Sequence, residues 1–119
     1  MKYEEYKIQV SFVKWVQLQY PKFRDFIFHV PNGGKMSLIK GSRLKSLGVK
    51  PGVADILFMF RTNNFGGLWL EFKTPKGVQS LEQKKFEQLS KIAQYDYKIV
   101  RSIEEAIDVF KKYVENING

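Results

Sequence analysis

Two apolar runs separated by a glycine-containing turn place the strongest constraint on how this chain can fold. The first run lies within residues 53–60, the second within 68–73, and the turn spans 62–67. Aliphatic and aromatic residues dominate both runs, which is typical of buried strands, and the turn between them favours a β-hairpin. Charged residues nevertheless interrupt both runs, namely Asp55 in the first and Glu71 and Lys73 in the second.

Strand geometry gathers these charges on one side of the expected sheet. Side chains alternate between the two faces of a strand, so Glu71 and Lys73 share one face while Leu70 and Phe72 point to the other. If the two runs pair as a hairpin, Asp55 reaches the face of Glu71. Burying such charges is costly, and a divalent cation between the carboxylates would compensate. The alternative is an ion pair of Glu71 with Lys73, which leaves Asp55 unpaired in an apolar strand.

The length and composition predict one globular domain spanning residues 1–119, with 44% hydrophobic residues to build a core. The sequence has no cysteine and a single histidine, His29. Disulfides, thiolate metal sites and multi-histidine zinc sites within one chain are therefore excluded, which leaves oxygen ligands as the natural metal chemistry. The amino-terminal residues lack the apolar core of a signal peptide, and no apolar run approaches membrane-spanning length. A cytoplasmic protein is expected.

Positive charge is concentrated ahead of Asp55. Lysine and arginine number 20 against 12 acidic residues, a formal net charge of +8. No acidic residue lies between Asp25 and Asp55, and this interval contains Lys35, Lys40, Arg43, Lys45 and Lys50. A solvated basic loop would account for the pattern. The excess charge also favours a polyanionic partner such as nucleic acid.

Hydrophobic periodicity predicts the remaining elements. Helices are expected over residues 3–19, 38–47, 80–94 and from Ser102 to Ile117, with further short strands over 26–30 and 97–100. Ser80 with Gln83, and Ser102 with Glu105, have the spacing of capping boxes at helix starts. The expected inward residues of the helix over 80–94 are Phe86, Leu89, Ile92 and Ala93. A hairpin followed by a helix and another strand predicts an α/β fold with a mixed central sheet flanked by helices.

The first helix has more apolar surface than one buried face requires. One stripe contains Tyr6, Val10 and Val13, and a second contains Ile8, Phe12 and Trp15. The second stripe suggests a helix wedged between layers or one that contacts a second subunit. A homodimer is a hypothesis that follows from this surplus.

An acidic residue on one strand and a Glu-x-Lys sequence on the next supply the groups that phosphodiester hydrolysis needs. Asp55, Glu71 and the backbone carbonyl of Phe72 offer oxygen ligands for Mg²⁺ or Mn²⁺, which lowers the pKa of a bound water. Lys73 would stabilise negative charge as it develops in the transition state. The pattern is short, and similar charged patterns recur by chance and at salt bridges.

Four blocks of sequence together resemble the VRR-NUC (virus-type replication-repair nuclease) family of the PD-(D/E)xK superfamily. They occur in the family's order and span nearly the whole chain: Phe28 to Gly34, Leu47 to Asp55, Leu70 to Thr74, and Ser80 with Gln83. The resemblance implies a restriction-endonuclease-like core, metal-dependent DNA cleavage, and Asp55, Glu71 and Lys73 as catalytic residues. Stand-alone members of this size come from phages, which implies the cytoplasm of an infected bacterium and homodimers acting on branched DNA such as four-way junctions or flaps.

The resemblance also assigns roles to residues outside the strands. The family's first-helix glutamate and glutamine map onto Glu5 and Gln9, with Glu4 as the alternative acid. Glu5 would be a metal ligand, although a solvated acid favoured by the helix dipole would explain it equally. Gln83 matches a glutamine near the family's site, and its capping role is sufficient alone. Ala54 departs from the proline that often precedes the family's aspartate.

Residues that would contact DNA are expected before the hairpin and after its second strand. They are His29, Asn32, Lys35, Lys40, Arg43, Lys45, Lys50 and Lys76. Phosphate contacts of this kind give salt-sensitive affinity that is largely independent of sequence. His29 is equally compatible with a partly buried strand position. Two other functions share these residues: a nucleic-acid-binding module without turnover, and an RNA nuclease.

Overall fold

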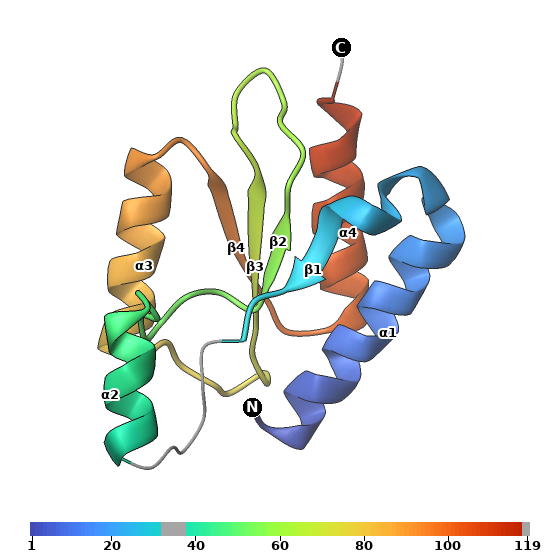
Figure 1. Cartoon of the computed structure of the whole chain (residues 1–119). Coiled ribbons are helices and arrows are strands. Elements are labelled where there is room, and N and C mark those ends of the chain that lie inside the picture. The colour runs from blue at the N-terminus through green and yellow to red at the C-terminus, as the bar shows by residue number, and fades with distance from the viewer. Residues whose placement is uncertain (32–37, 118–119) are drawn as a thin grey trace.

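A computed structural model describes residues 1–31 and 38–117. Figure 1 shows a central sheet with helices on both faces. The sheet has four strands in the order β1 (Ile27–His29), β2 (Ile56–Phe58), β3 (Leu68–Phe72) and β4 (Asp96–Val100). The first three strands pair antiparallel, whereas β3 and β4 are parallel. The expected α/β class with a mixed sheet is confirmed, and it is consistent with a restriction-endonuclease-like core.

Helices cover the two faces of the sheet unequally. On one face lie α1 (Tyr3–Gln19) and α4 (Ile103–Glu115), which contact each other. On the other face lies α3 (Leu81–Ile92), which connects β3 to the parallel strand β4; α2 (Leu38–Ser46) precedes β2. Side-chain caps begin α3 and α4, as the Ser80 and Ser102 hydroxyls accept backbone N–H groups three residues later. No helix in the described ranges is long and apolar enough to cross a membrane.

The main core lies between the sheet and the pair α1 and α4. Leu68, Leu70 and Phe72 are alternate residues of β3 and are fully buried on this face. Phe110 of α4 contacts Phe12 and Phe58, with ring centroids 5.8 and 4.9 Å apart. Aromatic contacts at these distances add to the burial of apolar surface, which is the main force that stabilises the fold.

The second apolar stripe of α1 is covered within this chain, so of the two interpretations of the sequence the helix wedged between layers is the one that is confirmed. Phe12 is fully buried, and Trp15 packs edge to face against Phe110 with ring centroids 6.0 Å apart. Because α1 contacts both β3 and α4, two sides of the helix are covered within one chain. The exposed large apolar residues of α1 are instead Tyr3, Tyr6 and Leu18, at other positions of the helix. The surplus stripe therefore gives no support for a homodimer.

Of two further local predictions, one was incomplete and one was wrong. The strand expected over 26–30 is confirmed as β1, but the 3₁₀ helix that the chain forms before it, over Pro21–Phe26, was not expected. In α3, Leu89 and Ile92 are 52% and 78% exposed, so they do not face inward. The side chains that contact residues of the sheet or the β3 to α3 loop include Phe86 and the polar residues Gln83 and Glu87. Apolar periodicity fails here because this interface contains polar contacts.

Candidate active site

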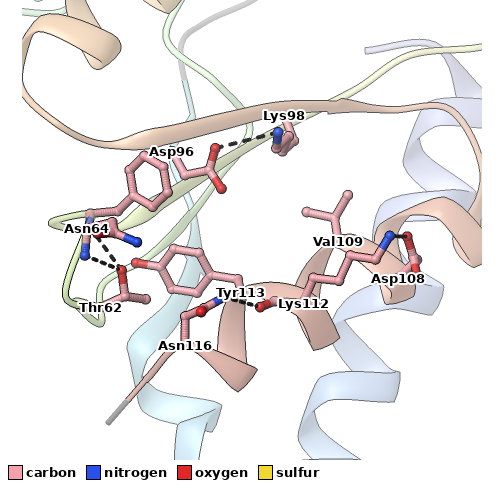
Figure 2. A pocket seen from close by; sticks show the side chains of 10 residues that line it. Thr62, Asn64, Asp96, Lys98, Asp108, Val109, Lys112, Tyr113 and Asn116 are labelled. Carbon is pink, nitrogen blue, oxygen red and sulfur yellow. Dashed lines mark hydrogen bonds and ion pairs between the residues drawn. The ribbon is translucent and has the colours of Figure 1, made fainter. Parts of the chain in front are cut away.

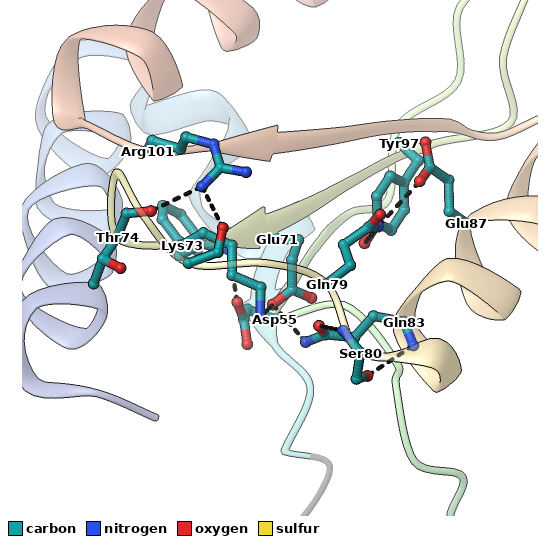
Figure 3. A network of polar contacts seen from close by, with 12 residues as sticks. Asp55, Glu71, Lys73, Thr74, Gln79, Ser80, Gln83, Glu87, Tyr97 and Arg101 are labelled. Atoms are coloured by element: carbon teal, nitrogen blue, oxygen red, sulfur yellow. Dashed lines mark hydrogen bonds and ion pairs between the residues drawn. The ribbon is translucent and has the colours of Figure 1, made fainter.

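The hairpin register places Asp55 opposite Glu71. Ile56 pairs with Leu70 across β2 and β3, so the residue before Ile56 faces the residue after Leu70. The backbone N–H of Asp55 donates to the Leu70 carbonyl at 3.1 Å. The Asp55 Oδ2 atom accepts the N–H of Phe72 at 2.8 Å (Figure 3). The backbone of the sheet therefore fixes both the position and the direction of this carboxylate.

Glu71 is almost fully buried, with 3% of its surface exposed. Its Oε2 atom accepts a hydrogen bond of 3.1 Å from the Gln83 side-chain amide. The Lys73 Nζ atom lies 4.0 Å from the same oxygen (Figure 3). The Oε1 atom is buried and has no hydrogen-bond partner among the described residues. A buried acceptor without a partner is costly and calls for a ligand that the protein chain does not supply.

The two carboxyl groups perturb each other. The pKa of Glu71 is raised from 4.5 to about 8, first by burial and then by the negative charge of Asp55, while Lys73 opposes the change. Burial also raises the pKa of Asp55, against the lowering effect of the Phe72 N–H. Both shifts have the same consequence: two charged carboxylates side by side are unfavourable here unless a positive charge lies between them.

A cleft of about 670 Å³ opens over this pair. Its walls are formed by Met1, Lys2, Glu5, Asp55, Glu71, Lys73, Lys76, Gly77, Val78 and Gln83. Glu5 is buried, whereas Glu4 is exposed and does not line the cleft. The negative charge of Glu5 raises the pKa values of both Asp55 and Glu71. Of the two candidate acids on α1, Glu5 is the one that the fold brings to the site; Lys2 and Val78 were not predicted.

The donor set fits a divalent cation. Across residues 1–31 and 38–117, no group of three acidic or histidine side chains is arranged to hold a metal ion. The carboxylates available to a cation in the cleft are therefore the neighbouring pair Asp55 and Glu71. In a strand, a residue's N–H and carbonyl point to the same edge, so the Phe72 carbonyl lies on the edge nearest Asp55. Mg²⁺ binds one or two carboxylates and keeps several waters, so this set matches its chemistry. A cation would also satisfy Glu71 Oε1.

Gln83 performs two tasks with one side chain. Its Oε1 atom accepts the backbone N–H of Ser80 at 2.8 Å, which completes the capping box of α3. This contact directs its amide nitrogen toward Glu71. The amide orientation is therefore fixed by the helix cap, and the sequence prediction of either a capping or a site role becomes both.

A close backbone contact brings α3 to the site. Gly52 has a φ of +86°, and a Cβ at this position would lie 2.5 Å from the carbonyl carbon of Glu82. Only glycine combines this φ with so close an approach. The turn before Asp55 therefore packs directly against the first turn of α3, which carries Gln83.

The predicted DNA-contacting residues lie in different parts of the molecule. Lys76 lines the acidic cleft. His29 ends β1, and its Nδ1 atom lies 3.0 Å from the side-chain amide nitrogen of Gln9. In its protonated form, the positive charge of this ring lowers the pKa of Asp55. Arg43, Lys45 and Lys50 are exposed on and after α2. Asn32, Lys35 and the side chain of Lys40 lie outside the described residues.

Arg101 holds the turn that follows Lys73, and its role was not predicted from the sequence. Its Nη1 atom donates to the carbonyls of Thr74 and Gly77 at 2.8 and 2.7 Å, with Pro75 at 3.5 Å. The Gly77 N–H closes the same turn onto the Thr74 carbonyl at 3.0 Å. This turn directly follows Lys73 and carries Lys76. Its partners are backbone carbonyls 24 to 27 residues earlier in the chain, so no local sequence pattern predicts these contacts.

A second cavity of about 330 Å³ lies near the start of β4 and the end of α4, away from the acidic cleft (Figure 2). Its charges are paired within it, Lys98 with Asp96 at 3.9 Å and Lys112 with Asp108 at 3.0 Å. The Tyr113 hydroxyl donates to the Phe60 carbonyl at 2.6 Å. The four charged residues that line this cavity are thus paired with one another.

Comparison with known proteins gives a structural likeness. No protein-family model matches the sequence, and no curated protein is significantly similar to it. A solved structure described as a "VRR_NUC domain protein" matches with a TM-score of 0.84 and 22% sequence identity. The match covers 98% of this chain and 92% of that chain. This chain therefore has the fold of that VRR_NUC domain protein over nearly its whole length.

Proposed function

We propose that this protein is a VRR-NUC nuclease that hydrolyses phosphodiester bonds in DNA with Mg²⁺ or Mn²⁺. The observation that carries the proposal is the pair of buried Glu71 and half-buried Asp55, held with Lys73 at the base of an open cleft. Two carboxylates that repel each other in a partly buried place destabilise the fold. Their presence therefore points to a function, such as binding a cation. The shared fold with a VRR_NUC domain protein supports the same conclusion.

The acidic residues would hold the cation. Asp55, Glu71 and the Phe72 carbonyl are the ligands, and Glu5 adds negative charge from the cleft wall. When bound, Mg²⁺ or Mn²⁺ neutralises phosphate charge and lowers the pKa of water. The Phe72 N–H keeps one Asp55 oxygen directed, and Gln83 does the same for one Glu71 oxygen. Each carboxylate thus keeps its second oxygen for the ligand.

Lys73 acts on the substrate side. Its ammonium is 4.0 Å from Glu71 and largely buried, with 13% of the side chain exposed. A fixed positive charge in such a place stabilises the negative charge that develops on phosphate oxygens and orients the attacking water. Gln83 is a positioning residue because it acts through Glu71.

The substrate in this proposal is branched DNA, such as a four-way junction or flap. Exposed Arg43, Lys45 and Lys50, with Lys76 in the cleft, would bind phosphates. The family resemblance of the sequence blocks supports this substrate, a homodimeric working form, and action in the cytoplasm of a phage-infected bacterium. The first helix does not contribute to the case for the dimer.

Labelled linear, flap and four-way DNA, incubated with Mg²⁺, Mn²⁺ or a chelator, test the proposal. We expect metal-dependent cleavage, and Asp55→Asn should lower it by at least about 100- to 1,000-fold while DNA is still bound. The matched control is Asp25→Asn, an exposed acid outside the cleft. Equal cleavage by Asp55→Asn and the unchanged protein would contradict the proposal.

Two further outcomes identify the alternative functions. Binding of branched DNA without cleavage in either metal would indicate a binding module that keeps this fold. Faster cleavage of an RNA version of the same junction would indicate an RNA nuclease, which uses the same ligands.

A further inference from the structure

A third pocket, different from the acidic cleft and from the cavity near the end of α4, lies beside the acidic cleft. It has a volume of about 340 Å³ and lies between the loop before β2 and one side of α3. Pro51, Val53, Phe86 and Leu89 give it apolar walls. Lys50 and Lys85 also line it, with Glu82 as the acidic residue. Apolar walls with a few charged groups are typical of sites that bind a flat organic group attached to a charged one.

Only the first turn of α3 separates this pocket from the acidic cleft. Glu82 lines the pocket, and the next residue, Gln83, lines the cleft and donates to Glu71. Neighbouring Cα atoms are about 3.8 Å apart, so the two sites lie within reach of one short ligand. The close contact of Gly52 with Glu82 fixes the loop that forms the opposite wall.

The aromatic wall of the pocket is held in place from the sheet. Phe86 meets Trp69 edge to face at 5.0 Å and lies 6.3 Å from Tyr97. Leu89 beside it is 52% exposed, although a leucine facing the sheet would be buried. A braced aromatic ring beside an exposed aliphatic side chain gives the pocket a lasting apolar surface.

We propose that this pocket binds an unpaired nucleobase of the strand whose phosphate lies in the acidic cleft. The inference rests on the proposed nuclease function and adds a substrate feature to it. Charge complementarity favours nucleic acid as the occupant, because two lysines and one glutamate line the pocket and its net charge is therefore positive. Bases in a duplex are stacked and paired, so the pocket selects strands with an unpaired nucleotide next to the cleaved bond. Structure selectivity thereby gains a physical cause.

Binding without cleavage tests the inference directly. Single-stranded and flap oligonucleotides, intact or with one abasic site moved along the strand, are titrated in the presence of a chelator. We expect an abasic site at one position next to the cleaved bond to weaken binding about tenfold, the usual effect of losing one stacked base. Affinities within twofold for every abasic position would overturn the inference.

Two pairs of variants locate the effect. Leu89→Ser should remove most of the preference for the intact base, while Ile92→Ser, exposed on the same helix outside the pocket, should retain it. Lys85→Gln should weaken binding, while Lys84→Gln, its exposed neighbour outside the pocket, should weaken it less. All four positions are exposed, so folding should be unaffected. If Leu89→Ser changes only the oligomeric mass in sedimentation, the pocket is a protein contact and the inference is wrong.

Failure of this inference can be told apart from failure of the nuclease proposal. A protein that cleaves with metal but shows no abasic effect keeps the nuclease proposal and loses the base pocket. A protein that shows the abasic effect but never cleaves keeps the pocket and loses the nuclease proposal.

Discussion

The two faces of β3 differ in what they contribute to the molecule. On one face, Leu70 and Phe72 are fully buried against α1 and α4. On the other, Glu71 lies between them in sequence and is almost as buried, but it faces Asp55 and Lys73. Strand alternation thus puts residues that stabilise the fold and residues that destabilise it within one pentapeptide. The aromatic face holds rigid the backbone that the acidic face needs for its geometry.

The largest expected effect on stability is on the aromatic face. Phe110→Ala removes a ring that contacts Phe12, Phe58, Trp15 and Tyr20. We expect the free energy of unfolding in urea to fall by about 3–5 kcal/mol, because a cavity remains where the ring was.

The control for this measurement is Leu18→Ala. Leu18 is 79% exposed, so the change should be within about 0.5 kcal/mol. If Phe110→Ala and Leu18→Ala lowered the free energy of unfolding by similar amounts, the aromatic face would not be the main source of stability.

On the acidic face, by contrast, the charged side chain of Glu71 is expected to lower the stability of the metal-free protein. Because the folded-state pKa of Glu71 is raised from 4.5 to about 8, its contribution to stability is fully present below pH 4.5 and is lost as pH rises through about 8. The melting temperature of the metal-free protein should therefore fall from pH 5.5 to 8.5. Glu71→Gln should reduce this fall, and Mg²⁺ should raise the melting temperature more at pH 8.5 than at 5.5.

Glu104→Gln serves as the comparison, since Glu104 is exposed in the first turn of α4. The pH dependence of this variant should follow that of the unchanged protein. If the melting temperature of Glu71→Gln had the same pH dependence as that of the unchanged protein, ionisation of Glu71 would not destabilise the fold.

The smallest expected change in stability separates the two tasks of Gln83. Ser80→Ala and Gln83→Ala each remove part of the α3 cap and should cost about 1 kcal/mol in urea unfolding. Only Gln83→Ala also removes the hydrogen bond to Glu71, so only this variant should lose cleavage rate at saturating DNA. Equal rates in the two variants would show that Gln83 acts on the helix alone.

Much of the fold and the centre of the site could be predicted from the sequence. The spacing of Asp55, Glu71 and Lys73 within apolar runs predicted one shared face, and the hairpin register brings them together there. Capping-box spacing correctly predicted the starts of α3 and α4. These features depend on neighbours in sequence or on simple alternation.

Features that depend on distant partners could not be predicted. Leu89 appeared to face inward because apolar periodicity assumes an apolar interface, whereas α3 turns Gln83 and Glu87 toward polar partners. Trp15 appeared to be surplus because the sequence does not show that α4 packs beside α1. Arg101 binds only backbone carbonyls, which every residue provides, so its sequence neighbours give no sign of its role.

The contact of Arg101 with the turn after Lys73 has a practical use. A guanidinium that binds carbonyls recognises the shape of the backbone and is indifferent to the side chains on it. Lys76 projects from this turn into the cleft wall, so it can be exchanged for residues of other charge while the turn keeps its form. In the proposed nuclease, substitutions of Lys76 would therefore adjust how strongly DNA is held at this position without altering the proposed catalytic residues.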